Sequence, residues 1–252
     1  MTSSASPDPA ICFDRVSFRL HGRELVHELA FSVRQGETLV LLGRSGSGKT
    51  TSLKLINRLL EPSAGEVRVN GRPTTAWDPI RLRRGIGYVI QEGGLFPHFT
   101  VARNIALVPR IEKWPPERVQ ARVEELLALV GLSSDLATRY PQQLSGGQRQ
   151  RVGVARALAA DPPIVLLDEP FSGLDPITRS ELQKEFRALQ QRMKKAVILV
   201  THDLREALLL ADRLALMEDG RLIVNLPAAE FPHSSDPLVR AYVEAFSGGD
   251  PR

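Results

Sequence analysis

The sequence predicts an α/β fold with a mixed, mainly parallel core sheet, an N-terminal antiparallel β segment and an inserted helical subdomain. Three segments, at residues 38–42, 164–167 and 196–200, are apolar almost throughout, as expected of parallel strands covered on both faces. Between about residues 92 and 160 the pattern is helical instead. Strand and helix patterns that alternate around such an insert indicate an α/β domain with a helical subdomain.

The expected β segments begin near the N-terminus. Residues 11–18 and 29–33 have the pattern of short strands, with turn signals at residues 21–22 and 35–36. A further alternating run, residues 66–71, ends in Asn-Gly, which is a strong signal for a tight turn between strands. These segments predict the antiparallel part of the fold.

The expected helices show apolar stripes at helical spacing. One begins at Pro115-Pro116, because proline is favoured in the first helical turn, and its apolar face comprises Val119, Val123, Leu126, Leu127 and Val130. Another lies between the last two apolar strands and carries Leu182, Phe186, Leu189 and Met193. After Gly220 we expect a strand and then a C-terminal helix within about residues 228–246, centred on residues 238–246.

The length and composition favour one globular domain. With 252 residues, 42% of them hydrophobic, the chain can bury a sizeable core. We expect residues 11–252 to form this domain and the Ser/Pro-rich residues 1–10 to form a disordered tail, since they lack the apolar centre of a signal peptide. No apolar run approaches the length that crosses a bilayer.

The charge is mildly basic, with a formal net charge of +4 from 33 Lys and Arg against 29 Asp and Glu. The densest basic cluster, Arg81, Arg83 and Arg84, is typical of a solvated surface, so no nucleic-acid partner is expected. Cys12 is the single cysteine, which excludes a disulfide within the chain. Together these features favour a cytosolic protein.

A phosphate-binding loop follows the first apolar strand. Residues 43–50 read G-x-x-x-x-G-K-T and lead into a helical pattern, which is the strand–loop–helix context that gives this motif its meaning. The glycines let backbone N–H groups converge on an anion, and the helix N-terminus adds its positive end. An ordinary glycine-rich turn is the alternative, which this context disfavours. The candidate nucleotide-binding residues here are Gly43, Arg44, Ser45, Gly46, Ser47, Gly48, Lys49, Thr50 and Thr51.

Two carboxylates end the strand at residues 164–167. Asp168 and Glu169 would lie at the carboxyl edge of the sheet, where ligands bind in open parallel sheets. Asp168 is placed to hold Mg²⁺, and Glu169 to orient or deprotonate an attacking water. The alternative is an acidic helix start before Pro170, which is disfavoured by the pairing with the phosphate loop.

Leu144-Ser145-Gly146-Gly147-Gln148 opens a long basic helix. A serine cap followed by glycines leaves backbone N–H groups free for an anion. These residues alone leave two alternatives open, a second phosphate site or a glycine-rich helix start.

Taken in order, these motifs resemble the nucleotide-binding subunit of an ATP-binding-cassette (ABC) transporter over about residues 11–225. The phosphate loop is followed by Gln91, Leu144–Gln148, Val165–Pro170, Ser172–Asp175 and Thr201–Asp203. The resemblance implies a P-loop NTPase fold and ATP hydrolysis. It also implies two copies stacked head to tail, with each ATP held between the loop of one copy and the Ser-Gly-Gly-Gln segment of the other.

The resemblance also implies individual roles. Ser145, Gly147 and Gln148 would contact the γ-phosphate bound by the partner copy. His202 would act beside Glu169 in catalysis, and Asp175 would communicate across the dimer. The implied Mg²⁺ ligands are Thr50, Gln91 and Asp168.

One position departs from the family pattern. ABC domains usually stack an aromatic side chain on adenine near residue 20, but Leu20 stands there. Phe18 is two residues earlier and is expected on the same side of a regular strand. The adenine contact is therefore not assigned.

A narrower resemblance is to ATPases of importers for quaternary-amine osmoprotectants such as glycine betaine, carnitine and choline. It rests on residues 87–109, Asn57-Arg58-Leu59, Trp114 and residues 151–158. It implies transmembrane permeases, a separate substrate-binding protein and a location at the cytoplasmic face of the membrane. Leu95-Phe96-Pro97 would suit a groove for a permease helix, or would belong to the core of the helical subdomain.

Many ATPases of that group carry regulatory CBS domains after the core, whereas about thirty residues follow it here. We therefore expect this chain to act without ionic-strength sensing by such domains.

Two other functions stay open: an importer ATPase for another small solute such as an amino acid, and a non-membrane ABC ATPase acting on nucleic acid or ribosomes.

Overall fold

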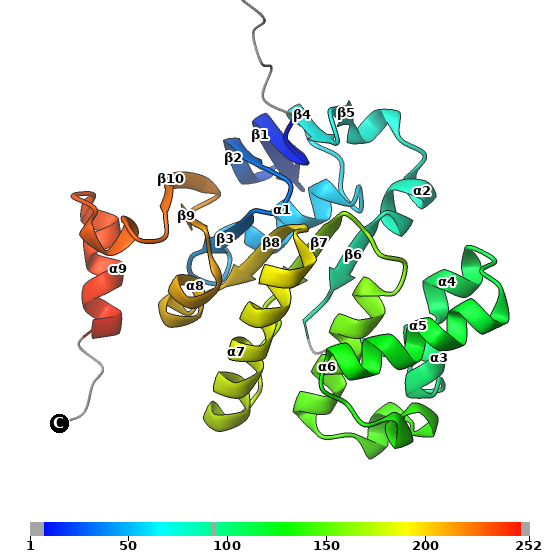
Figure 1. Ribbon diagram of the computed structural model, residues 1–252. Helices are drawn as coiled ribbons and strands as arrows, with labels where there is room; N and C mark the ends of the chain where they lie inside the picture. Colours follow the sequence, from blue (N-terminus) through cyan, green and yellow to red (C-terminus); the bar gives the residue numbers. More distant parts are fainter. Residues whose placement is uncertain (1–7, 92–93, 248–252) are drawn as a thin grey trace, which may run out of the picture.

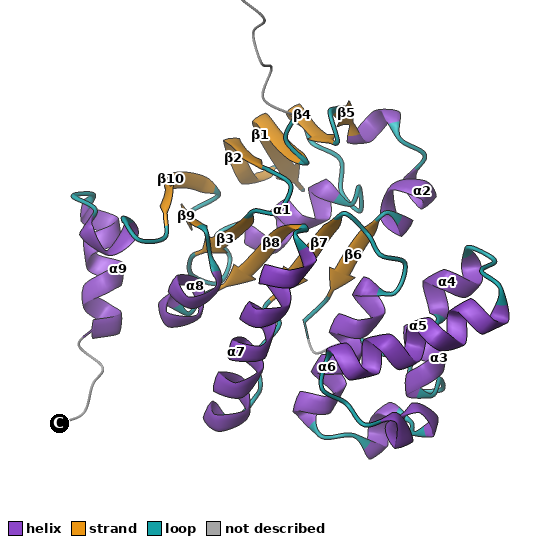
Figure 2. Cartoon of the chain, viewed as in Figure 1, coloured by secondary structure: helices purple, strands orange, loops and turns teal. Residues whose placement is uncertain are grey.

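The computed structural model describes residues 8–91 and 94–247, and within them the strands form two sheets. Residues 1–7 of the expected tail and residues 92–93 at the expected start of the helical subdomain lie outside the described residues. The smaller sheet is antiparallel, in the order β2-β1-β4-β5 (Figure 2). Its strands are β1 (Ile11–Leu20), β2 (Arg23–Val33), β4 (Ala64–Val69) and β5 (Arg72–Pro73).

The larger sheet has the order β10-β9-β3-β8-β7-β6, and its strands are parallel except for β10 (Figure 1). This mixed sheet, with its antiparallel neighbour, is the arrangement that the sequence predicts. The strands are β3 (Thr38–Leu42), β6 (Ile86–Val89), β7 (Ile164–Asp168), β8 (Ala196–Thr201), β9 (Arg213–Glu218) and β10 (Arg221–Pro227).

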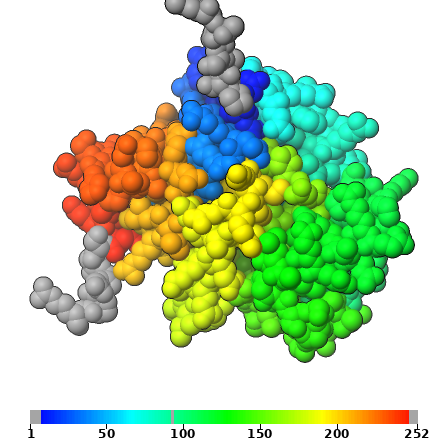
Figure 3. Space-filling view, viewed as in Figure 1, coloured from blue at the N-terminus to red at the C-terminus, as the bar shows by residue number. Residues whose placement is uncertain are grey.

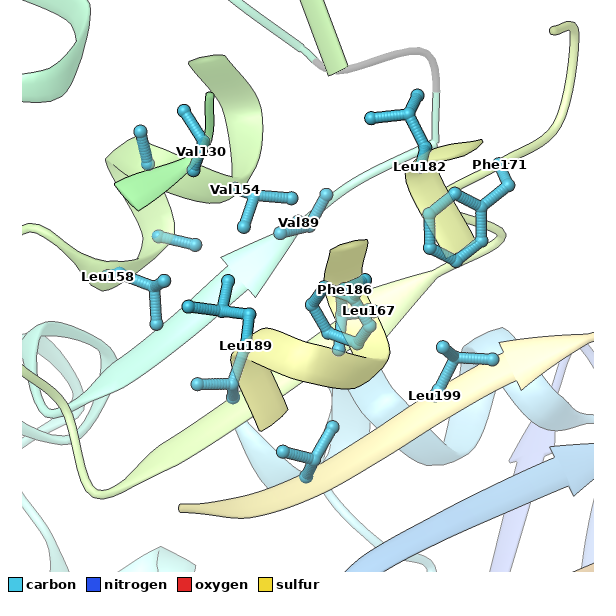
Figure 4. Close-up of a cluster of buried hydrophobic side chains, with 14 of the residues drawn as sticks. Val89, Val130, Val154, Leu158, Leu167, Phe171, Leu182, Phe186, Leu189 and Leu199 are labelled. Atoms are coloured by element: carbon cyan, nitrogen blue, oxygen red, sulfur yellow. The ribbon is translucent and has the colours of Figure 1, made fainter. Parts of the chain in front are cut away.

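The apolar strands of the large sheet serve two cores, one on each face. Because successive side chains of a strand point to opposite faces, Leu39 and Leu41 of β3 join the core shared with the small sheet. Val40 and Leu42 join the core beneath the helices on the other side. Figure 4 shows part of this second core, where Phe186 and Leu189 pack near Leu167. Burial on both faces explains why these strands are apolar throughout.

Helices cover the second face of the large sheet. The helices between β6 and β7 form a lobe beside the sheets (Figure 3). The helix that we expect to begin at Pro115-Pro116 is confirmed, with Pro116 as its first residue. Within the described part of the chain the α-helices are α1 (Lys49–Ile56), α2 (Pro79–Arg84), α3 (Val101–Ile105), α4 (Leu107–Ile111), α5 (Pro116–Leu129), α6 (Gly146–Leu158), α7 (Pro176–Met193), α8 (Leu204–Leu210) and α9 (Pro237–Ser247).

The C-terminal helix begins later than the expected residue 228. Residues 231–233 form a short 3-10 helix, and α9 begins at Pro237. The Asp236 carboxylate accepts hydrogen bonds from the amides of Leu238 (2.8 Å) and Val239 (3.2 Å), which caps α9 at this point. An N-cap followed by proline fixes the helix start, so the outer bound of residue 228 was too early, whereas the helix expected around residues 238–246 is confirmed.

The N-terminal expectations need two further corrections. Ala10 was assigned to a disordered tail, yet it is buried in the core of the small sheet and its carbonyl accepts a hydrogen bond from the Asn70 amide. Phe18 was expected beside Leu20, but it is buried whereas Leu20 is exposed. The pairing of β1 with β2 shifts register on both sides of Phe18, and such irregularities break the alternation of a regular strand.

No helix within residues 8–91 and 94–247 combines the length and the apolar character needed to cross a bilayer.

Candidate active site

The phosphate loop lies between the end of β3 and the start of α1. Gly48, the residue before α1, has φ of +95°, which favours glycine. A Cβ atom on Gly48 would lie 2.8 Å from the Leu25 carbonyl oxygen, and one on Gly43 would lie 2.3 Å from that of Met217. Neighbouring strands therefore leave no room for side chains at these positions.

Lys49 is buried beneath the loop. Its ammonium donates hydrogen bonds to the carbonyls of Gly43 and Arg44, both at 2.7 Å, and to the Ser47 hydroxyl at 3.4 Å. Burial lowers the pKa of Lys49, whereas the nearby carboxylates of Glu169 and Asp168 raise it. The loop thus holds a cation at its centre, where a phosphate chain would need one.

Asp168 ends β7 directly beside the loop. Its carboxylate accepts hydrogen bonds from the Thr50 hydroxyl (2.8 Å) and the Tyr88 hydroxyl (3.3 Å). Burial raises the pKa of Asp168, and these hydrogen bonds lower it. Burial, followed by the charge of Asp168, raises the pKa of Tyr88, so its phenol stays protonated as a donor. Tyr88 is a partner of the site that the motif-based prediction missed.

Glu169 is held in an uncommon backbone conformation. Its φ is +45°, in the left-handed region, which costs a non-glycine residue energy and is typical of functional sites. The Glu169 amide donates to the Val200 carbonyl (3.0 Å), and its carbonyl accepts from the Ser172 amide (3.2 Å) and hydroxyl (2.9 Å). These contacts fix the direction of the side chain.

His202 follows β8 and meets Glu169. Its Nδ1 atom lies 3.3 Å from Oε2 of Glu169, although the two residues are far apart in the sequence. The imidazole is largely exposed, while the Glu169 carboxylate is mostly covered. In this position the Glu169 carboxylate can accept a proton from a water molecule, while the imidazole of His202 lies close enough to interact with the carboxylate.

One pocket, with a volume of about 780 Å³, lies among these residues, and Asp168 stands outside its lining but is hydrogen-bonded to Thr50, which lines it. Gln91, Glu169 and His202 line it, and so does the phosphate loop except for Gly43 and Ser47. The motif-based prediction did not include the other side of the pocket, which consists of Leu25, Glu218 and residues of α9.

The Ser-Gly-Gly-Gln segment lies outside this pocket, at the N-terminus of α6. The Ser145 hydroxyl accepts from the Gln148 amide (3.2 Å), and the Gln148 side chain accepts from the Ser145 amide (2.9 Å). This capping box leaves Ser145 exposed and Gln148 half-buried. A Cβ atom on Gly147 would come within 2.7 Å of Thr178, so close packing against α7 requires glycine there.

Asp175 likewise lies outside the pocket. It caps α7, and its carboxylate accepts from the Thr178 amide at 3.0 Å. The site residues predicted from the sequence thus fall into two groups, one around the pocket and one at the N-termini of α6 and α7.

A buried carboxyl group beside the site gives a pH-dependent prediction. Burial, with the Asp203 charge next, raises the pKa of Glu206 to about 8, and Oε2 accepts from Gln183 at 3.2 Å. Because the pKa of Glu206 is higher in the folded state than in the unfolded state, protonation of its carboxyl group favours folding. This contribution to stability is fully present below the pKa of the unfolded chain, about 4.3. That stability is lost as the pH rises through about 8.

We therefore expect Glu206→Gln to raise the free energy of unfolding at pH 8.5 by on the order of 2 kcal/mol, with the gain shrinking towards pH 5. Denaturant unfolding at both pH values measures it. An equal effect of the substitution at both pH values would contradict the assigned pKa shift.

Comparison with known proteins agrees with this geometry. The family model described as "ABC transporter" matches residues 26–172. The choline transport ATP-binding protein OpuBA of Bacillus subtilis (strain 168) is 47% identical over 223 residues, 88% of this chain and 58% of that protein. The glycine betaine/carnitine/choline transport ATP-binding protein OpuCA of the same strain is 50% identical over 218 residues, 83% of this chain and 57% of that protein. The chain thus spans less than two thirds of either relative.

Among solved structures, the dimeric post-hydrolysis state of the ATP-binding cassette MJ0796 bound to ADP and Pi superimposes with a TM-score of 0.77. It is 33% identical in sequence, and the match covers 86% of this chain and 98% of that one. This similarity, with the two sheets described above, confirms the α/β P-loop fold class predicted from the sequence.

Proposed function

The chain belongs to the ABC transporter family, and on that premise we propose that it hydrolyses ATP to power an importer for quaternary-amine osmoprotectants such as glycine betaine, choline or carnitine. The observation that carries ATP hydrolysis is the convergence of the phosphate loop and the Glu169–His202 pair on one pocket, with Asp168 hydrogen-bonded to Thr50 of that loop. The names of the two Bacillus relatives support the substrate class.

In this proposal the loop amides and Lys49 bind the β- and γ-phosphates. Glu169 takes a proton from a water molecule whose oxygen attacks the γ-phosphorus. The bond between that phosphorus and the bridging oxygen breaks, which releases ADP and phosphate. His202, 3.3 Å from Glu169, orients the carboxylate and the γ-phosphate.

The residues around Thr50 suit Mg²⁺, a hard cation that prefers oxygen ligands and keeps several waters. The Thr50 hydroxyl and the Asp168 carboxylate lie 2.8 Å apart, and Gln91 lines the pocket that Thr50 also lines. These three residues would hold the ion, which supplies charge neutralisation for the phosphates.

A second copy of the chain would complete the site. Ser145, Gly147 and Gln148 stand at the N-terminus of α6, away from the pocket of their own chain. Ser145 is exposed, Gln148 is half-buried and Gly147 is buried. In a head-to-tail dimer this end of α6 would face the γ-phosphate bound by the other copy, where its positive end favours the negative charge.

The permease would bind beside Gln91. A groove there is lined by residues that include Tyr88, Ile90, Phe96 and Leu107. Ile90 and Phe96 are 38% and 41% exposed, which suits a short apolar helix of a membrane subunit. Such docking would hold the chain at the cytoplasmic face of the membrane, and the extracytoplasmic substrate-binding protein would contact the permease alone.

His202→Ala tests the role of the imidazole. We expect ATP turnover to fall by about 10- to 100-fold while the dissociation constant for ATP changes by less than about threefold, because the phosphate loop remains intact. Separate hydrolysis and binding assays distinguish the two quantities. A loss of affinity as large as the loss of turnover would contradict this assignment.

Uptake measured in the cells that produce the chain tests the transport function. Deleting its gene should abolish uptake of radiolabelled glycine betaine, choline or carnitine at high osmolarity, and the wild-type gene should restore it while Lys49→Ala does not. Unchanged uptake of all three solutes, with loss of another solute's uptake, would favour the other importer function.

A further inference from the structure

The pocket that contains the phosphate loop has a second side, formed by α9. Residues 238, 241, 242, 245 and 246 line it, and this spacing places them on one face of the helix. The pocket volume of about 780 Å³ is within the range of small-molecule sites. A nucleotide with its phosphates in the loop would therefore have its base within reach of α9.

Two aromatic rings dominate this face of α9. Tyr242 and Phe246 are one helical turn apart, with ring centroids separated by 5.7 Å and planes inclined by 16°. Both pack partly against the core of the domain, which restricts their movement. Ala241 and Ala245 add only methyl groups, so a planar ligand can approach the rings.

The position of α9 is well fixed. Val239 is fully buried, and Asp236 caps the first turn. Burial raises the pKa of Tyr242. The positive charge of the nearby Arg44 lowers this pKa, and the negative charge of Glu218 raises it. Arg44 belongs to the phosphate loop, so Tyr242 is close to both sides of the pocket.

The β1–β2 segment does not supply such a ring. Leu20 is 45% exposed and lies outside the lining of the pocket, while Phe18 is buried in the core between the sheets. From β2 it is Leu25, an aliphatic residue, that lines the pocket.

We propose that the base of the bound nucleotide stacks on Tyr242 and Phe246 of α9, opposite Leu25. This inference rests on the proposed binding of ATP. Stacking recognises the flat face that every base has. The two rings would therefore increase the affinity for a nucleoside triphosphate, but they would not increase the affinity for a triphosphate that carries no base.

Titration calorimetry with ATP and with inorganic tripolyphosphate, both with Mg²⁺, tests the proposal. In the full chain we expect Tyr242→Ala combined with Phe246→Ala to weaken ATP binding by about 10- to 100-fold and to leave tripolyphosphate binding unchanged. Tyr242→Phe keeps the ring and should keep the ATP affinity. Arg240→Ala, at an exposed residue of α9 that does not line the pocket, is the matched control.

Other outcomes overturn the proposal in distinguishable ways. Wild-type ATP affinity in the folded double variant would show that the rings do not contact the base. Equal weakening of ATP and tripolyphosphate would show that α9 only supports the phosphate loop. Binding of neither ligand by the wild-type chain would overturn the proposed function, and this inference with it.

Discussion

Lys49→Ala is expected to weaken ATP binding by at least about 100-fold. The ammonium is buried among the loop carbonyls, 2.7 Å from two of them, and it is the cation at the centre of the loop. Charge-assisted hydrogen bonds to a phosphate are among the strongest in proteins, and their loss would leave the phosphate charge uncompensated in a partly desolvated site. Calorimetric titration with Mg²⁺ and ATP measures the change.

Lys54→Ala is the matched control for this substitution. Lys54 lies on the same helix but is exposed and outside the pocket, so its removal should leave the ATP affinity within about twofold of wild type. If a folded Lys49→Ala variant bound ATP as tightly as the wild type, the assignment of the phosphate loop would be wrong.

Glu169→Gln is expected to slow ATP hydrolysis by about 100- to 10,000-fold and to leave ATP binding nearly unchanged. The amide fills the same volume but cannot accept the proton of the attacking water. The backbone around Glu169 is anchored to Val200 and Ser172, so the side chain should keep its direction. Because hydrolysis would no longer separate the copies, the variant should accumulate as a dimer with Mg²⁺ and ATP.

Steady-state hydrolysis and light scattering measure these two effects. Glu181→Gln, at an exposed position of α7 away from the pocket, should hydrolyse ATP at the wild-type rate. Hydrolysis at that rate by Glu169→Gln would remove Glu169 from the mechanism, and a purely monomeric variant in Mg²⁺ and ATP would contradict the head-to-tail dimer.

The strands and the phosphate side of the pocket could be predicted because local rules determine them. Strands buried on both faces must be apolar, as at residues 38–42 and 164–167. The conformation of Gly48 and the close approach of Leu25 require glycine. Strand topology then places Asp168 and Glu169 beside the loop, since parallel strands deliver their carboxyl ends to one edge.

The α9 side of the pocket could not be predicted from such rules. The spacing of Tyr242 and Phe246 indicates a helix face, but the sequence does not specify what that face meets, because only tertiary packing brings α9 beside Arg44 and Leu25. The irregular pairing around Phe18 is also a tertiary feature. Because of it the Phe18 side chain is buried in the core. Regular strand alternation had predicted that Phe18 and Leu20 would lie on the same side of the strand.

Purification of the tagged chain from detergent-solubilised membranes of its own cells tests the central claim most directly. The proposed function predicts that a transmembrane permease and a quaternary-amine-binding protein are recovered with it, as identified by mass spectrometry against an untagged control. Recovery of ribosomal or nucleic-acid-binding proteins without any membrane subunit would contradict the importer function. The phosphate-binding pocket would then support an ATPase activity that is not coupled to transport.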